Sequence, residues 1–217
     1  TMLIPMIRAV LFDLDDTLMD HTSAMHAALD EWCAELGVAQ GQHARFSALE
    51  RKWFSAYERG EVTHQGQRIE RCREFLGQTL DDAASLAAYD GYLAAYQRNW
   101  RAFPDALPAL RRALAAGLNV GILTNGAREM QEGKLRAGGL NLPEVQLIAT
   151  VDLGIPKPQA AAYHEGCRVL RSEPAHTLMV GDSLANDVEG ARAAGLQAVY
   201  LQRDGSGEIS SLDELSF

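Results

Sequence analysis

Three carboxylates stand close together near the N-terminus, directly after a short apolar segment. Asp13, Asp15 and Asp16 follow residues 9–12, which are all apolar. Side chains of an extended chain alternate between two faces, so Asp13 and Asp15 share a face. Carboxylates at the end of a buried strand are costly unless a cation lies beside them. One could then act as a nucleophile and metal ligand while the other transfers protons, although Asp15 or Asp16 could instead cap a helix.

A small polar turn ends a second apolar segment. Thr124, Asn125 and Gly126 supply a hydroxyl and consecutive backbone amides in front of a predicted helix. Such a turn can hold phosphate oxygens. The same tripeptide also occurs in ordinary loops, so taken alone it does not distinguish the two interpretations.

A lysine between two prolines forms the third group. Pro156 and Pro158 restrict the backbone on both sides of Lys157, which defines where the lysine lies. An ammonium held beside several carboxylates would neutralise both a nucleophile and a phosphate group. The alternative is a solvated lysine in a loop.

Two further carboxylates follow another apolar segment. Asp182 comes directly after it, and Asp187 stands near the start of a predicted helix, where a first-turn carboxylate is also favourable. The four groups together supply carboxylate oxygens, a hydroxyl and an ammonium. Magnesium prefers an all-oxygen site and leaves coordination positions to water and phosphate.

The elements that must position these residues are strands alternating with helices. Five apolar runs are typical of buried parallel strands: Ala9–Leu14, Leu118–Thr124, Val145–Thr150, Thr177–Val180 and Gln197–Leu201. Four helical patterns lie between or before them: Leu107–Ala116, Ala127–Ala137, Gln159–Leu170 and Asn186–Ala194. This alternation predicts an α/β fold with a Rossmann-like three-layer core around a parallel five-stranded sheet. Ligands of such sheets bind outside the carboxyl ends of the strands, where the four groups fall.

One long segment interrupts the alternation. Residues 19–102 contain only helical patterns, so we expect an inserted all-helical domain, with the core formed by residues 1–18 and 103–217. Arg68 and Arg71 within it are candidates for binding a second anionic group of a substrate. Solvated arginines on a helix surface are the alternative.

The composition limits the partners. A net charge of −9 argues against binding to nucleic acid polymers or anionic membranes. Cys33, Cys72 and Cys167 are widely separated, which favours reduced thiols in a cytoplasmic protein. The longest apolar run near the N-terminus stops at Asp13, so we expect neither a membrane span nor a signal peptide.

At this point the residues resemble a known family. The haloacid dehalogenase superfamily has four motifs, and this chain is similar to them in order: D-L-D-D-T-L, L-T-N-G, a K-P pair and G-D-S-x-x-N-D. The helical insertion resembles the type-one cap of that superfamily. The likeness spans nearly the whole chain and is nearest to soluble phosphatases and nucleotidases. Asp16 stands where many relatives have Gly, and an acidic residue there is a familiar variant.

The resemblance implies a magnesium-dependent hydrolase of small phosphate monoesters that works through an aspartyl-phosphate intermediate. Asp13 would attack phosphorus, and Asp15 would protonate the leaving oxygen and later activate water. Asp13, the backbone carbonyl of Asp15 and Asp182 would bind Mg²⁺.

The remaining matched positions would hold the substrate. Thr124 and Lys157 would bind the transferring phosphoryl group, with Asn125 helping at the backbone. Asp187 would support the metal site or Lys157 without binding the metal itself.

Three alternatives stay open. A phosphomutase acting on a sugar phosphate shares the first half-reaction. A 2-haloacid dehalogenase needs a nucleophilic aspartate but neither Mg²⁺ nor an acid for an alkoxide, so Asp15 and Asp182 argue against it. A non-catalytic binding protein could share the fold. We expect a small phosphorylated metabolite as the partner of a monomer or homodimer.

Overall fold

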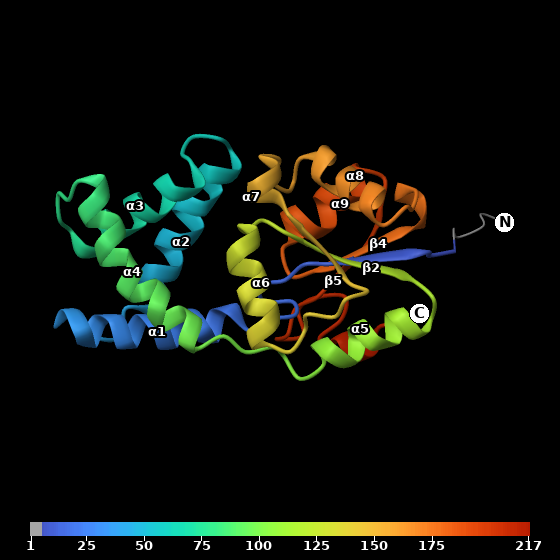
Figure 1. The fold of residues 1–217 in the computed structure, drawn as a ribbon, viewed down its shortest axis with the longest axis horizontal. Coiled ribbons are helices and arrows are strands. Elements are labelled where there is room, and N and C mark those ends of the chain that lie inside the picture. Colours follow the sequence, from blue (N-terminus) through green and yellow to red (C-terminus); the bar gives the residue numbers. More distant parts are fainter. Residues whose placement is uncertain (1–5) are drawn as a thin grey trace. The chain divides into compact units, whose positions relative to one another are not determined.

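The chain folds into two compact units, shown together in Figure 1. The structure is a computed structural model that describes residues 6–217. The core unit contains residues up to Asp20 and from Arg101 to Phe217, and the helical unit contains His21–Trp100. These bounds lie two residues inside the expected insertion 19–102 at each end.

The core unit is built on one parallel sheet, as predicted. Its strands are β1 (Ala9–Phe12), β2 (Asn119–Thr124), β3 (Gln146–Ala149), β4 (Thr177–Gly181) and β5 (Gln197–Tyr200). The spatial order is β3-β2-β1-β4-β5, so β1 lies in the centre. Phe12 is in register with Ile122 of β2 and Val180 of β4. The three central strands therefore end side by side.

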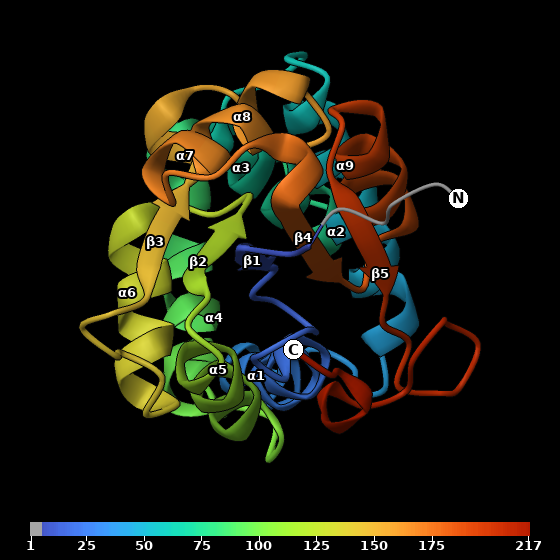
Figure 2. The same ribbon diagram turned by 90° about the vertical axis from the view of Figure 1, so that its right-hand side faces the viewer.

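Helices cover both faces of this sheet. They are α5 (Ala106–Ala115), α6 (Arg128–Ala137), α7 (Thr150–Leu153), α8 (Ala160–Val169) and α9 (Gly190–Ala193). Figure 2 shows α8 and α9 on one side of the sheet and α5 on the other. The predicted Rossmann-like three-layer arrangement is thus confirmed.

The segments that differ from prediction lie at strand ends. Thr150 begins the short helix α7 and does not extend β3. The expected helix 186–194 is divided into a π-helical segment, η2 (Leu184–Glu189), followed by α9. Single π-turns recur at functional sites because they redirect side chains within a helix. Here the π-turn contains Asp187.

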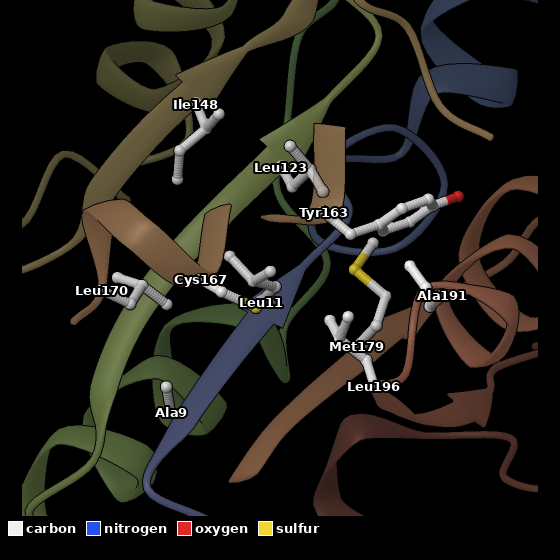
Figure 3. Packing of buried hydrophobic residues seen from close by; sticks show 11 residues of the cluster. Ala9, Leu11, Leu123, Ile148, Tyr163, Cys167, Leu170, Met179, Ala191 and Leu196 are labelled. Carbon is white, nitrogen blue, oxygen red and sulfur yellow. The ribbon is translucent and has the colours of Figure 1, made fainter. Parts of the chain in front are cut away.

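The core unit is held by apolar packing between the strands and α8 (Figure 3). Leu11, Leu123 and Met179 come from the three central strands, and all are fully buried beneath Tyr163 and its neighbours on α8. Burying such side chains is worth roughly 1.5–3 kcal/mol each. This packing fixes the strand ends that carry the candidate site.

The helical unit contains four helices, as the sequence patterns predict. They are α1 (His21–Leu36), α2 (His43–Glu58), α3 (His64–Leu76) and α4 (Asp82–Arg98). Trp32 is fully buried among the rings of Phe46, Phe75, Tyr89 and Tyr92. The aromatic cluster gives this unit a core of its own.

Across residues 6–217, no helix is both long and apolar enough to cross a bilayer. Cys33, Cys72 and Cys167 are buried free thiols, in keeping with the expected absence of a disulfide framework.

Candidate active site

The carboxyl ends of β1, β2 and β4 bring the predicted groups to one edge of the sheet. Asp13 directly follows β1, and its backbone amide donates to the carbonyl of Val180 on β4 at 2.8 Å. Thr124 ends β2, and Asp182 directly follows β4. The parallel register therefore gathers residues that are far apart in sequence, because each strand ends at the same level.

Lys157 joins the first and fourth groups through its ammonium. Its Nζ donates to Oδ1 of Asp13 at 2.7 Å and to Oδ1 of Asp187 at 2.6 Å, and its side chain is 2% exposed. Burial alone would lower the pKa of Lys157, but the charges of Asp13 and Asp187 raise it above its usual range. The lysine is therefore a permanent cation beside Asp13.

Asn125 fixes the backbone of that lysine. Its Oδ1 accepts from the backbone amide of Lys157 at 2.8 Å, and its Nδ2 donates to the carbonyl of Lys157 at 2.9 Å. The hydroxyl of Thr150 donates to the same Oδ1 at 2.9 Å. The side chain of Asn125 therefore positions Lys157, and the help that its backbone is expected to give in holding phosphate stays a prediction.

The site holds more negative charge than its own cations neutralise. Carboxylate oxygens of Asp13, Asp182 and Asp187 lie within 4.8 Å of one another. Burial, together with the neighbouring carboxylates, raises the pKa of Asp13 to about 7 despite Lys157. Burial, then Asp13, Asp187 and Asp16, raises the pKa of Asp182 to about 8. Such a group of oxygen donors suits a hard divalent cation, which would lower both pKa values.

The donors divide into direct and supporting ones. Both oxygens of Asp187 are engaged, Oδ1 by Lys157 and Oδ2 by the backbone amide of Ser183 at 3.0 Å. Asp187 is also only 1% exposed, and its supporting role stays a prediction. Asp182 is held differently, because the side-chain amide of Gln202 donates to its backbone carbonyl at 2.6 Å. Asp13 and Asp182 are thus the carboxylates best placed to bind a cation directly.

Asp15 points to a different pair of residues, which the sequence did not suggest. The Nζ of Lys134 lies 2.6 Å and 2.7 Å from its two carboxylate oxygens. The Nε2 of Gln131 donates to Oδ2 of Asp15 at 3.3 Å and to the hydroxyl of Thr124 at 2.7 Å. A signal was present on α6: Gln131, Lys134 and Leu135 follow i, i+3, i+4 spacing, which puts a lysine on the buried face of a helix.

Backbone conformation or close packing restricts the residue type at three motif positions: Asp16, Gly126 and Gly181. Asp16 has a φ of 58°, a left-handed conformation that Gly adopts readily and Asp tolerates better than most residues. Gly, which the family resemblance leads us to expect at this position, would adopt the same conformation without strain. A Cβ at Gly126 would collide with the side chain of Gln131, and one at Gly181 with the carboxylate of Asp187.

The two candidate arginines of the helical unit, Arg68 and Arg71, differ in burial. Arg71 is 5% exposed, and its Nη1 donates to Oε1 of Glu50 at 2.6 Å. Its guanidinium also lies over the rings of Phe46 and Tyr89. The charge of Arg71 thus pairs with a partly buried carboxylate, and its expected contact with a substrate anion stays a prediction. Arg68 is half-buried, and burial lowers its pKa.

Comparisons with known proteins identify relatives of this chain. Residues 7–195 match the sequence model of the haloacid dehalogenase-like hydrolases. The pyrimidine 5′-nucleotidase PynA of Streptococcus pneumoniae is 28% identical over 197 residues, covering 88% of this chain and 82% of that protein. The (S)-2-haloacid dehalogenase 1 of Pseudomonas sp. strain CBS-3 is 31% identical over 213 residues, covering 97% and 89%.

A solved structure gives the same result for the fold. The HAD-hydrolase YfnB of Bacillus subtilis, in a crystal structure bound to magnesium, superposes with a TM-score of 0.85 at 25% identity. The superposition covers 96% of each chain. Because the sequence match spans most of the chain and the fold agrees throughout, the chain belongs to the haloacid dehalogenase-like hydrolases.

Proposed function

We propose that this hydrolase cleaves small phosphate monoesters with the help of Mg²⁺, through an aspartyl-phosphate intermediate on Asp13. The observation that carries the proposal is the combination of Asp13, Asp15 and Asp182 at one edge of the sheet, beside the buried ammonium of Lys157. Carbon–halogen cleavage would require a nucleophile but neither an excess of carboxylates nor a proton donor. Relatives named as a nucleotidase and as phosphoserine phosphatase are in line with this choice, but others are named as (S)-2-haloacid dehalogenases, so the proposal depends on the carboxylates of the site.

The first half-reaction would transfer the phosphoryl group to the protein. An oxygen of Asp13 forms a bond to phosphorus while the bond from phosphorus to the ester oxygen breaks. Asp15 gives its proton to that leaving oxygen. Lys157 already donates to Oδ1 of Asp13, so the other oxygen would attack. The hydroxyl of Thr124 and the ammonium of Lys157 would hold the phosphoryl oxygens, over which the negative charge is spread in the transition state.

The second half-reaction would release inorganic phosphate. A water molecule attacks phosphorus, Asp15 takes its proton, and the bond from phosphorus to Asp13 breaks. Asp15 thus serves twice, first as an acid and then as a base. Mg²⁺, held by Asp13, Asp182 and the carbonyl of Asp15, would supply further neutralisation of the carboxylates and the phosphate. Asp187 would keep Lys157 in place from behind.

A substrate and metal screen tests the proposal. The chain is assayed for phosphate release from nucleoside monophosphates, sugar phosphates, phosphoglycolate and p-nitrophenyl phosphate, with Mg²⁺ or after exhaustive chelation. We expect hydrolysis that chelation abolishes and added Mg²⁺ restores. Full activity after chelation would show that the carboxylate group does not work with a metal. Halide release from 2-haloacids without phosphate release would favour the dehalogenase alternative.

A phosphomutase and a phosphatase can be distinguished by the product that they release. A phosphomutase would return the phosphoryl group to a second hydroxyl of a sugar phosphate, so an isomeric sugar phosphate would accumulate with little inorganic phosphate. We expect inorganic phosphate in amounts equal to the alcohol released. Phosphorus NMR of the reaction mixture distinguishes the two products directly.

A further inference from the structure

The acid–base carboxylate of the proposed reaction is held by two residues of α6. We propose that Lys134, assisted by Gln131, is the positioning residue for Asp15. This inference rests on the proposed function, because Asp15 transfers protons only in that reaction. Lys134 touches Asp15 and lies on the helix that directly follows the turn containing Thr124.

The two donors define the orientation of the carboxylate as well as its place. The ammonium of Lys134 lies about equally far from Oδ1 and Oδ2, at 2.6 Å and 2.7 Å, which fixes the position of the group. Gln131 donates only to Oδ2, at 3.3 Å, and so distinguishes the two oxygens. Together they set the plane of the carboxylate, which decides where a proton can be given or taken.

Gln131 also links the carboxylate to the group expected to hold phosphate. The same Nε2 donates to the hydroxyl oxygen of Thr124 at 2.7 Å. The carboxylate of Asp15 and the hydroxyl of Thr124 therefore both accept a hydrogen bond from the side chain of Gln131, which is 1% exposed. Gly126 leaves the space that this side chain occupies, because a Cβ at position 126 would collide with Gln131.

The charges of the site are divided between two lysines. Lys157 serves Asp13 and Asp187, whereas Lys134 serves Asp15. The side chain of Lys134 is 4% exposed while that of Asp15 is 31% exposed. Burying an ammonium to reach a partly exposed carboxylate is a poor way to stabilise a fold, since an apolar side chain would fill the same space at lower desolvation cost. Control of Asp15 explains the lysine better.

The test separates proton transfer from the rest of the reaction by the leaving group. Lys134→Met is compared with wild type on glycerol phosphate, whose alkoxide needs a proton, and on acetyl phosphate, whose carboxylate does not. The ratio kcat/KM reports the first half-reaction for both. We expect it to fall by about 10² for glycerol phosphate, the size of an acid–base contribution, and by less than about threefold for acetyl phosphate.

Three further variants test whether Lys134 acts through its charge and through Asp15. Lys134→Arg, which keeps the charge, should recover most of the activity on glycerol phosphate. Adding Lys134→Met to Asp15→Asn should lower the activity by less than about twofold, because the lysine acts through Asp15. Arg136→Met, an exposed residue of the same helix, should leave both substrates unaffected. If Lys134→Met does not fold, Lys134→Gln replaces it in the same comparison.

The results that would overturn the inference are equally definite. An equal loss for both substrates, or a full additional loss on top of Asp15→Asn, would show that Lys134 does not act through Asp15. Unchanged activity of the folded Lys134 variant would do the same. These outcomes require an active wild type. A wild type that hydrolyses no phosphate ester would overturn the proposed function, and this inference with it.

Discussion

Both units of the molecule bury charged side chains, but the network around Glu50 in the helical unit is balanced by its own cations, whereas Asp13 and Asp182 at the strand ends of the core unit are not. Glu50 is contacted by Nε2 of His21 at 3.1 Å and by Nη1 of Arg71 at 2.6 Å. Burial opposes ionisation, yet these two groups hold the pKa of Glu50 well below its usual range. In the core unit, burial and neighbouring carboxylates raise the pKa of Asp13 to about 7 and that of Asp182 to about 8.

In the network around Glu50 the positive and negative charges are balanced. In the cluster of Asp13, Asp182 and Asp187 the carboxylates outnumber the cations that contact them. A carboxylate with enough cations around it titrates low, so its network needs nothing from solution. A cluster whose carboxylates titrate high, although a buried lysine is present, is short of positive charge. The first arrangement stabilises a unit, and the second is typical of a site that binds an ion or acts on a substrate.

The largest expected effect concerns catalysis in the core unit. Asp13→Asn should lower turnover of any hydrolysed ester by about 10³ or more, because it removes the nucleophile. The fold should survive, since the change also removes one charge from an overcharged cluster. Steady-state phosphate release and thermal unfolding without metal measure the two effects. Glu144→Gln, an exposed acidic position of the same unit, is the control. Near-normal turnover of Asp13→Asn would refute the mechanism.

The next effect concerns stability in the helical unit. Arg71→Met should destabilise it by about 3 kcal/mol, because the mostly buried Glu50 would lose one of its two charged partners and the buried guanidinium would no longer pack on Phe46 and Tyr89. Trp32, Trp53 and Trp100 are all the tryptophans of the chain and lie in this unit, so their fluorescence in urea reports it selectively.

A matched variant sharpens that measurement. Arg59 forms an exposed pair with Glu61, so Arg59→Met should leave the urea midpoint of the unit nearly unchanged. Equal stability of the Arg71 and Arg59 variants would contradict the view that the Glu50 network holds the helical unit together.

The two networks should respond to pH in opposite directions. The folded pKa values of Asp13 and Asp182 lie above the ordinary 3.8, so their contribution to stability is complete at low pH and is lost as pH rises through about 7 and about 8. The folded pKa of Glu50 lies below the ordinary 4.5, so its contribution is present above that pH and is lost as pH falls.

Hydrogen exchange measured by mass spectrometry can follow both units at once. In chelator, peptides from β1 and β4 should exchange faster at pH 8 than at pH 5 after correction for the intrinsic rate. Millimolar Mg²⁺ should slow them at pH 8 and have little effect at pH 5, where the carboxylates are protonated. Peptides from α2 and α3 should not respond to Mg²⁺. A response to Mg²⁺ of equal size in both units would contradict the conclusion that only the core unit binds the metal at these carboxylates.

The smallest effect concerns substrate choice. If Arg68 contacts a second anionic group, Arg68→Ala should raise KM for the preferred ester by about five- to tenfold, while acetyl phosphate is unaffected. Lys157→Ala should lower activity on every substrate, because each presents the same phosphoryl group. Arg51→Ala, an exposed position on α2, serves as the control. An equal loss on both substrates for Arg68→Ala would remove the idea that this arginine selects the substrate.

Much of the fold could be predicted because its signals are local. The apolar run that ends at Asp13 and the one that ends at Thr124 each carry the length and composition of a buried strand. Parallel strands end at the same edge of a sheet, so residues that follow them must meet there. The contacts of Lys157 with Asp13 and Asp187 join residues 144 and 30 positions apart, yet this rule made their proximity expected.

The order of the elements, the helical insertion and the carboxylates at the strand ends could all be predicted, because each depends on residues that are adjacent in the chain. Which helix faces meet those carboxylates depends on how the elements pack. Lys134 reaches Asp15 across 119 positions only because α6 turns that face toward β1. Arg71 became a structural cation because the packing of α2 against α3 placed Glu50 beside it. How a helix is rotated against its neighbours depends on the whole core, so no local pattern specifies it.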